Sequence, residues 1–268
     1  MCLYITPNNI SEIKHNNMTT TYQNLNVITL ADRQTLGAKA AVHAAITIKK
    51  LLSEKEHINI IFAAAPSQSA FLESLKNDTT IEWERINAFH MDEYLGLPQD
   101  APQSFGNFLK DVIFGHVNFR SVNYINCNAA DVNEERERYA QLLHEHKPDI
   151  VFMGIGENTH LAFNEPFQAD FNDPEVIKVV TLDPVCRRQQ VNDGCFEQID
   201  DVPIQALTLT IPVLLGAAYI FCMVPGINKA DAVTKTLKEP VSVEYPSTIL
   251  REHQDATLYL DLQSASLI

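Results

Sequence analysis

Short apolar runs alternate along this chain with longer segments whose apolar residues recur at helical spacing. The run INIIFAAA at 58–65 has no polar alternation, which is typical of a strand covered on both faces of a parallel sheet. Similar strand-like runs occur at 86–91, 122–127, 149–155, 206–211, 218–224 and 256–262. Helical patterns fall around them, at 35–55, 67–76, 104–114, 133–146, 212–217, 229–237 and 246–253.

The repeated order of strand and helix predicts an α/β fold of the Rossmann-like kind, with one open, mostly parallel, twisted sheet and helices on both faces, in a single domain. In such a sheet the ligand site lies beyond the carboxyl ends of the strands. The stretch from Asn164 to about Asp201 is irregular and polar, and we expect it to form a lid, at about 167–200. Residues 1–20 are polar and Asn-rich, so we expect a flexible extension before a domain that spans 21–268.

Charge and composition argue against several function classes. With 20 Lys and Arg against 34 Asp and Glu, the formal net charge is −14, which argues against nucleic-acid binding because a phosphate backbone requires a cationic face. No apolar run reaches the roughly 18 residues of a membrane span. The N-terminus lacks the pattern of a secretory signal, so we expect a cytoplasmic protein. The five cysteines show no CxxC or short Cys/His spacing, so neither zinc nor a disulfide framework is indicated.

Two adjacent carboxylates, Asp92 and Glu93, come directly after the predicted strand at 86–91. At the point where the chain leaves the sheet, either of them is placed to act as a general base on a bound substrate. A solvated acidic turn that caps the next helix is the structural alternative. The residues alone leave these readings open.

Two further strand ends carry polar groups. The segment MGIGENTHLAFNEP at 153–166 has two glycines, which let the backbone approach a ligand closely, followed by His160 and Glu165. The turn VPGINK at 224–229 leads from a strand into a helix, and its amide groups and Lys229 can hold a phosphate. A structural histidine and an exposed lysine at a helix start are the corresponding alternatives.

These segments resemble a known family. HMDEYLGLPQDAPQSFGNFL is similar to the MDEYxGLPxxxPxSYxxFM signature of glucosamine-6-phosphate deaminases (isomerases), and MGIGENTHLAFNEP resembles their GGxGxDGHIAFNEP signature. The segments stand in the family's order and spacing, and the resemblance runs from about residue 35 to the C-terminus. The 6-phosphogluconolactonases share this superfamily, but their second segment resembles GxGxDGHTASLFP and they lack the MDEY segment.

The resemblance implies a role for each matching residue. Asp92 falls on the carboxylate that moves a proton between C2 and C1 of the opened sugar. His160 falls on the histidine that assists ring opening, and Glu165 falls on the carboxylate that tunes it. Lys229 falls on the lysine that contacts the substrate phosphate. This chemistry requires no metal and no organic cofactor.

One departure from the family's pattern lies next to the histidine. Asn158 stands where the family has an Asp before its Gly-His pair, so a carboxylate that would interact with the imidazole is replaced by a neutral amide. Removal of that negative charge is expected to lower the tendency of His160 to be protonated. The ring-opening step, or deprotonation of the amino group, is therefore expected to differ in this chain.

The phosphate-binding segments also depart from the family. Its glycine-rich loop is replaced here by AAAPSQS at 63–69, whose polar residues can still offer donors at a helix start. These candidate phosphate ligands are Ser67, Gln68 and Ser69. For the family's lid arginine, Arg187 and Arg188 are both candidates, because a planar guanidinium suits a phosphate.

The leading hypothesis is an amino-sugar phosphate deaminase/isomerase that converts glucosamine-6-phosphate or galactosamine-6-phosphate to a ketose phosphate and ammonia. The alternatives are a related aldose–ketose isomerase or lactonase, and a sugar-phosphate-binding protein that has lost catalysis. The expected partner is a small sugar phosphate, with no nucleic acid and no membrane. A homo-oligomer is an open alternative, because relatives are often oligomeric and the sequence fixes neither the number of subunits nor the stereochemistry of the sugar.

Overall fold

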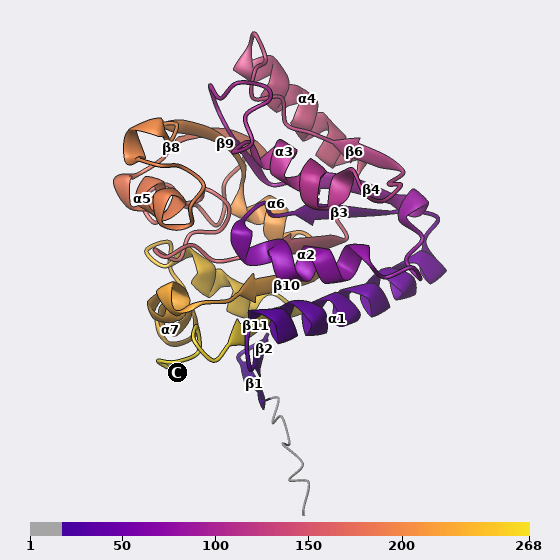
Figure 1. Cartoon of the computed structure of the whole chain (residues 1–268), viewed down its shortest axis with the longest axis vertical. Coiled ribbons are helices and arrows are strands. Elements are labelled where there is room, and N and C mark those ends of the chain that lie inside the picture. The colour runs from indigo at the N-terminus through magenta and orange to yellow at the C-terminus, as the bar shows by residue number, and fades with distance from the viewer. Residues whose placement is uncertain (1–17) are drawn as a thin grey trace, which may run out of the picture.

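A computed structural model describes residues 18–268, and its largest feature is one twisted sheet (Figure 1). The strand order is β1-β2-β11-β10-β7-β3-β4-β6. Every neighbouring pair is parallel except β1 with β2, which is antiparallel. The strands are β1 (Met18–Tyr22), β2 (Leu25–Leu30), β3 (Ile58–Phe62), β4 (Ile86–His90), β6 (Ser121–Asn123), β7 (Ile150–Met153), β10 (Tyr219–Val224) and β11 (Ala256–Asp261). The predicted open, mostly parallel sheet is confirmed.

Helices cover both faces of this sheet, which explains why its strands read as unbroken apolar runs. In β3, Ile60 and Phe62 pack into one core and Ile61 into the other. The first core includes residues of α1 (Arg33–Glu54), α2 (Ser69–Lys76) and α3 (Phe105–Leu109). The second includes residues of α4 (Val132–Glu145), α6 (Ile211–Leu215) and α7 (Ala230–Lys238). In the first core α1 and α2 pack closely, since a Cβ atom at Gly37 of α1 would lie 2.6 Å from the backbone carbonyl carbon of Ala70 in α2.

A second, smaller sheet lies beside the carboxyl ends of the main strands. It is antiparallel, in the order β5-β9-β8, and consists of β5 (Asp92–Tyr94), β8 (Ile177–Thr181) and β9 (Gln205–Leu209). The strand expected at 206–211 therefore exists but belongs to this second sheet. Because β5 starts two residues after β4 ends, the chain passes from one sheet to the other at Asp92.

The expectation of an irregular lid at about 167–200 needs a correction. This segment contains β8 and the helix α5 (Pro184–Asn192), which begins with Asp183 as its N-cap. The strand was missed because its residues, IKVVT, are short and only partly buried, between turns rich in Asn and Asp. We keep the name lid segment for residues 167–200.

Several element boundaries also differ from the sequence expectations. The helix expected at 104–114 is α3 followed by a π-helical turn at Lys110–Phe114, and 246–253 forms a 3₁₀-helix at Pro246–Glu252. The β1–β2 hairpin and β5 were not predicted. Part of the expected extension, residues 18–20, belongs to β1, and residues 1–17 lie outside the described part of the chain.

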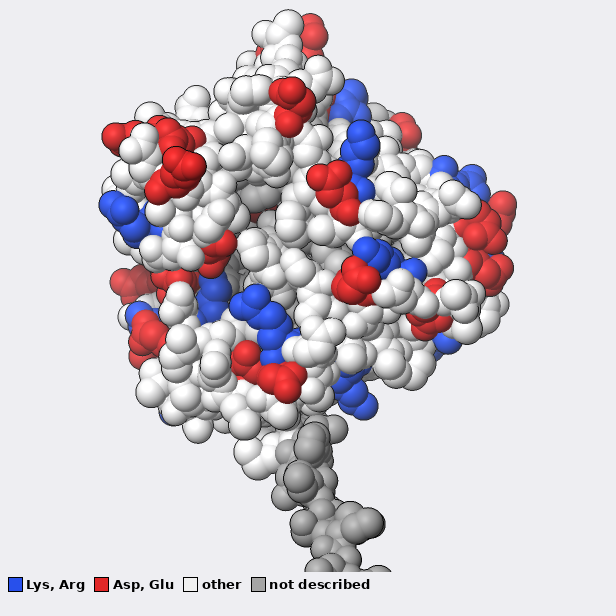
Figure 2. All heavy atoms as spheres, in the orientation of Figure 1, with Lys and Arg blue, Asp and Glu red and all other residues white. Residues whose placement is uncertain are grey.

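The described surface agrees with the charge analysis. On the face shown in Figure 2, basic side chains are scattered among acidic ones and form no continuous basic patch. No helix between residues 18 and 268 combines the length and the apolar character that a membrane crossing would need.

Candidate active site

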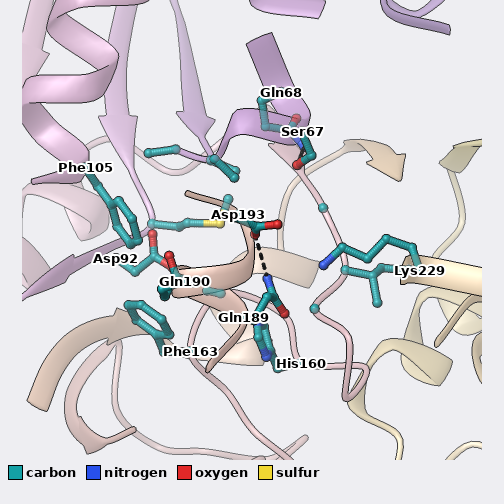
Figure 3. Close-up of a pocket in the computed structure, with 18 residues that line it drawn as sticks. Ser67, Gln68, Asp92, Phe105, His160, Phe163, Gln189, Gln190, Asp193 and Lys229 are labelled. Atoms are coloured by element: carbon teal, nitrogen blue, oxygen red, sulfur yellow. Dashed lines mark hydrogen bonds between the residues drawn. The ribbon is translucent and has the colours of Figure 1, made fainter. Parts of the chain in front are cut away.

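A pocket opens where the carboxyl ends of β3, β4, β7 and β10 meet the lid segment (Figure 3). The empty space in the pocket and at its open mouth amounts to about 570 Å³. Its polar lining comes from the turns after these four strands and from the end of α5. The polar side chains are Ser67, Gln68, Asp92, His160, Gln189, Gln190, Asp193 and Lys229. In Figure 3, Asp92 and Lys229 point into the pocket from opposite sides.

The two adjacent carboxylates after β4 have different surroundings. Glu93 is buried and accepts hydrogen bonds from Ser104 Oγ and from the backbone N–H groups of Tyr94, Phe105 and Gly106, at 2.8 to 3.0 Å. It thereby fixes the start of α3 and has no place in the pocket lining. Asp92 lines the pocket, and burial, followed by the charge of Glu93, raises the pKa of its carboxyl well above the ordinary value. Of the two candidates for the base, the geometry favours Asp92.

The ring of His160 lies directly over Gly156 in the turn after β7. A Cβ atom at Gly156 would stand 2.2 Å from the ring, so only glycine leaves room for the imidazole there. Burial is the main cause that lowers the pKa of His160 to about 3, with a further contribution from the charge of Lys229. The imidazole is therefore neutral at physiological pH.

Asn158 determines which nitrogen of this neutral ring carries the proton. Its Oδ1 accepts from the backbone N–H of His160 at 3.3 Å and lies 2.7 Å from His160 Nδ1, while its Nδ2 donates to Glu165 Oε2 at 3.4 Å. Since an amide oxygen can only accept, Nδ1 must be protonated and Nε2 must carry the lone pair. The structure thus brings the three predicted residues Asn158, His160 and Glu165 into one connected chain of hydrogen bonds.

Glu165 ends this series of hydrogen bonds, on the side away from the pocket, and does not line the pocket. It is buried, and its Oε1 accepts from the backbone N–H of Asp183, the N-cap of α5, at 3.3 Å. Burial first, and then its interaction with the Asp183 side chain, raises the pKa of Glu165 to about 8. Glu165 therefore connects the His160 turn to the start of α5, the lid helix.

The AAAPSQS segment supplies less to the pocket than its sequence suggests. Ser67 lines the pocket, and so does Gln68, but the Gln68 amide donates to the carbonyl of Met223 at 3.1 Å and to Ser67 Oγ at 3.2 Å. Gln68 therefore has no free side-chain donor for a phosphate. Ser69 is exposed at the start of α2 and does not line the pocket.

The two candidate lid arginines also lie away from the pocket. Arg187 donates to the carbonyls of Ile199 and Val202, at 2.6 and 2.9 Å, and so ties α5 to the end of the lid segment and the residues that follow it. Arg188 is exposed, and neither arginine lines the pocket. Among the described pocket residues, the single lysine or arginine is Lys229, which is buried. Burial lowers the pKa of Lys229, and the charges of Asp193 and Glu157 oppose that shift.

The lid helix presents other residues to the pocket, and sequence reasoning missed them. Gln189, Gln190 and Asp193 line the pocket, and Gln189 Oε1 accepts from the backbone N–H of Glu157 at 2.9 Å. The signal was available, because these positions continue the helical spacing of the buried Cys186 at i+3, i+4 and i+7. The same spacing places Arg187 and Arg188 on the sides of the helix that face away from the pocket.

Comparisons with known proteins identify the family. The sequence profile described as glucosamine-6-phosphate isomerases/6-phosphogluconolactonase matches residues 31–259. The chain belongs to this family. Glucosamine-6-phosphate deaminase of Listeria innocua is 34% identical over 201 residues, covering 75% of this chain and 83% of that protein. The Streptococcus gordonii enzyme of the same name is 32% identical over 244 residues, or 91% of this chain and 99% of its own.

Solved structures agree with the assignment to this family. A monomeric glucosamine-6-phosphate deaminase superposes with a TM-score of 0.81 at 31% identity, covering 90% of this chain and 99% of that chain. The 6-phosphogluconolactonase of Thermotoga maritima superposes with a TM-score of 0.72 at 19% identity, covering 88% and 98%. The second match shows a shared fold alone.

The neutral state of His160 can be tested at Asn158. In Asn158→Asp, a carboxylate replaces the amide oxygen beside Nδ1, so the pKa of His160 should rise by about 1 to 3 pH units. The measurement is an NMR titration of the histidine ring signals, with His160→Gln used to assign the signal. Asn158→Ala, which removes the acceptor without adding charge, should give no such rise. Identical titrations in the wild type and Asn158→Asp would contradict the assigned hydrogen bond.

The protonation of Glu165 predicts a pH-dependent stability difference. Its folded pKa of about 8 lies above the ordinary 4.5, so between these values the folded state holds a proton that the unfolded state has released. This group's contribution to stability therefore falls as pH rises. Glu165→Gln removes the effect. The free energy of unfolding of the variant, relative to that of the wild type, should therefore rise by on the order of 3 kcal/mol from about pH 5 to about pH 8.

Thermal or urea unfolding at several pH values measures this difference. The matched control is Glu244→Gln, which changes an exposed carboxylate far along the chain. Stability curves of Glu165→Gln and wild type that stay parallel across this pH range would show that Glu165 is not protonated in the folded protein.

Proposed function

We propose that this protein is an amino-sugar phosphate deaminase, which converts glucosamine-6-phosphate or galactosamine-6-phosphate to a ketose phosphate and ammonia. The observation that carries the proposal is one pocket that holds a buried carboxylate, Asp92, and a neutral imidazole, His160, with Lys229 and Ser67 available for a phosphate. Membership of the family and the deaminases named among the relatives support the same reaction.

His160 is suited to ring opening in this proposal. Because Nδ1 donates to Asn158, the lone pair of Nε2 is available to accept the proton of the C1 hydroxyl and to pass it to the ring oxygen as the C1–O5 bond breaks. The products are the C1 aldehyde and the C5 hydroxyl. Glu165 orients Asn158 through Nδ2 and thereby maintains this tautomer.

Asp92 then moves the proton. Its carboxylate removes the hydrogen from C2, the electron pair forms a C1–C2 double bond, and the C1 carbonyl oxygen takes up a proton to give an enol that carries the amino group on C2. Return of the proton from Asp92 to C1 gives an iminium ion at C2, which loses one N–H proton, in balance with the proton that the C1 oxygen took up, and becomes an imine. Water adds to the imine carbon and ammonia leaves, so the net change is the uptake of one water. Burial raises the basicity of the ionised Asp92 carboxylate, which helps it to remove a weakly acidic C–H proton.

The phosphate end depends on few groups in this proposal. Lys229 provides the positive charge and Ser67 a hydroxyl, while Gln190 offers an amide from the lid helix. Asp193 places a negative charge in the same lining. A phosphate site with one lysine is expected to bind its substrate more weakly at high ionic strength than a site that also holds an arginine.

The test is ammonia release and ketose phosphate formation from glucosamine-6-phosphate and galactosamine-6-phosphate, assayed side by side. Wild type should release ammonia from at least one of them, and Asp92→Asn should lower kcat by at least about 10²-fold, since loss of a general base costs about 10² to 10⁴. Glu84→Gln, which changes an exposed carboxylate, is the matched control and should keep full activity.

Other outcomes separate the alternatives. Unchanged turnover in Asp92→Asn would show that another group moves the proton. If the wild type releases no ammonia from either sugar although sugar phosphates raise its Tm, the deaminase proposal fails, because a ligand that binds the folded state stabilises it whether or not it reacts. An isomerase or a catalytically inactive sugar-phosphate-binding protein would then be favoured.

A further inference from the structure

His90, the last residue of β4, does not line the pocket, but both of its ring nitrogens form hydrogen bonds close to the pocket. The side chain is fully buried. Nδ1 lies 3.0 Å from the backbone carbonyl oxygen of Asp92, and Nε2 lies 2.8 Å from the backbone nitrogen of Ile125, just beyond β6. The imidazole therefore bridges the edge of the main sheet and the residue that carries the proposed base.

The two partners determine the tautomer of His90. The N–H of Ile125 can only donate, so Nε2 carries the lone pair, and the carbonyl of Asp92 can only accept, so Nδ1 carries the proton. Burial lowers the pKa of His90 to about 4, in agreement with a neutral ring. No other uncharged form of the ring satisfies both backbone groups.

The backbone around His90 is held from other directions as well. The hydroxyl of Tyr139 accepts from the N–H of His90 at 3.0 Å and donates to its carbonyl at 2.8 Å. The carbonyl of Met91 accepts from the N–H of Leu209 at 2.8 Å. The imidazole of His90 holds the carbonyl of Asp92, which is the residue where the chain passes from the main sheet to β5.

We propose that His90 is a positioning residue for Asp92, and that its Nδ1–H fixes the peptide plane from which the Asp92 carboxylate projects into the pocket. The inference rests on the proposed function, in which Asp92 moves a proton between two adjacent carbons. Such a transfer tolerates little displacement, because a shift of about 1 Å can cost about 10²-fold in rate. His90 acts through Asp92 and touches no substrate.

Two substitutions separate the two hydrogen bonds of the ring. In His90→Asn, the amide N–H₂ can occupy the place of Nδ1 and donate to the carbonyl of Asp92, but the side chain is too short to reach Ile125. In His90→Gln, the amide oxygen can reach the N–H of Ile125, but the carbon at the place of Nδ1 carries no donor for the carbonyl of Asp92. Each variant loses one buried hydrogen bond, so both should unfold at a lower Tm than the wild type.

The kinetic outcomes differ between the variants. His90→Asn should keep kcat within about threefold of wild type, and His90→Gln should lose about 10 to 10²-fold in kcat with KM within about twofold. Equal losses of kcat in the two variants, or a change confined to KM, would overturn the proposal. A wild-type enzyme that releases ammonia from an amino-sugar phosphate while both variants match its kcat would overturn it too, with the proposed function intact.

A measurement on the wild type does not depend on turnover or on the stability of the variants. In ¹⁵N NMR spectra of the histidine rings, His90 should show a protonated Nδ1 and an unprotonated Nε2 at neutral pH. The opposite tautomer would overturn the proposal. If the wild type turns over neither sugar, the proposed function fails, whereas this spectrum still decides whether the ring holds the Asp92 peptide.

Discussion

Withdrawal of ionisable groups from water is the constraint on which the pocket depends. Burial is the first cause of the pKa shift at Asp92, His160, Glu165 and Lys229, and in each case it favours the neutral form. The two carboxyls become stronger bases, and the imidazole remains neutral with a free lone pair. The lid segment contributes to this burial, because Gln189, Gln190 and Asp193 close the pocket over the carboxyl ends of the main strands.

The sequence predicted the parts of the fold whose physics is local and repetitive. Buried parallel strands are unbroken apolar runs, so β3, β7 and β10 could be recognised directly. β5 and β8 were missed because they are short and their pairing partner, β9, is distant in the chain. A strand that gains its stability from long-range pairing leaves little periodicity for a sequence pattern to show.

The sequence placed correctly those candidate residues that directly follow a strand of the main sheet or lie in the turn after it. Asp92, His160 and Lys229 lie in one pocket, as expected from the carboxyl ends of parallel strands. Arg187 was proposed on the chemistry of its guanidinium, yet the phase of α5 directs it to the backbone carbonyls of Ile199 and Val202. Gln68 was proposed as a donor, but its N–H groups are engaged by Met223 and Ser67. Which partner a polar side chain takes depends on the packed structure.

The turn that carries His160 holds a left-handed backbone conformation at a position where the chain departs from the family's glycine. Thr159, at the position of the Gly in the Asp-Gly-His signature, has φ of +71°, a conformation that β-branched residues rarely adopt. Its backbone carbonyl accepts from the N–H of Ser247 at 3.0 Å, which helps to hold this conformation. Strain of this kind persists only where surrounding contacts enforce it, and here it keeps His160 over Gly156.

Deuterium labelling in heavy water tests most directly whether one carboxylate moves the proton from C2 to C1. The account predicts that the hydrogen carried over from C2, and any deuterium that replaces it by exchange on Asp92, enter C1 of the ketose phosphate at one stereochemical position only, because Asp92 delivers the proton from one side of the planar intermediate. NMR of the isolated product resolves the two positions. Deuterium distributed equally between both positions, or full labelling in Asp92→Asn, would contradict the account.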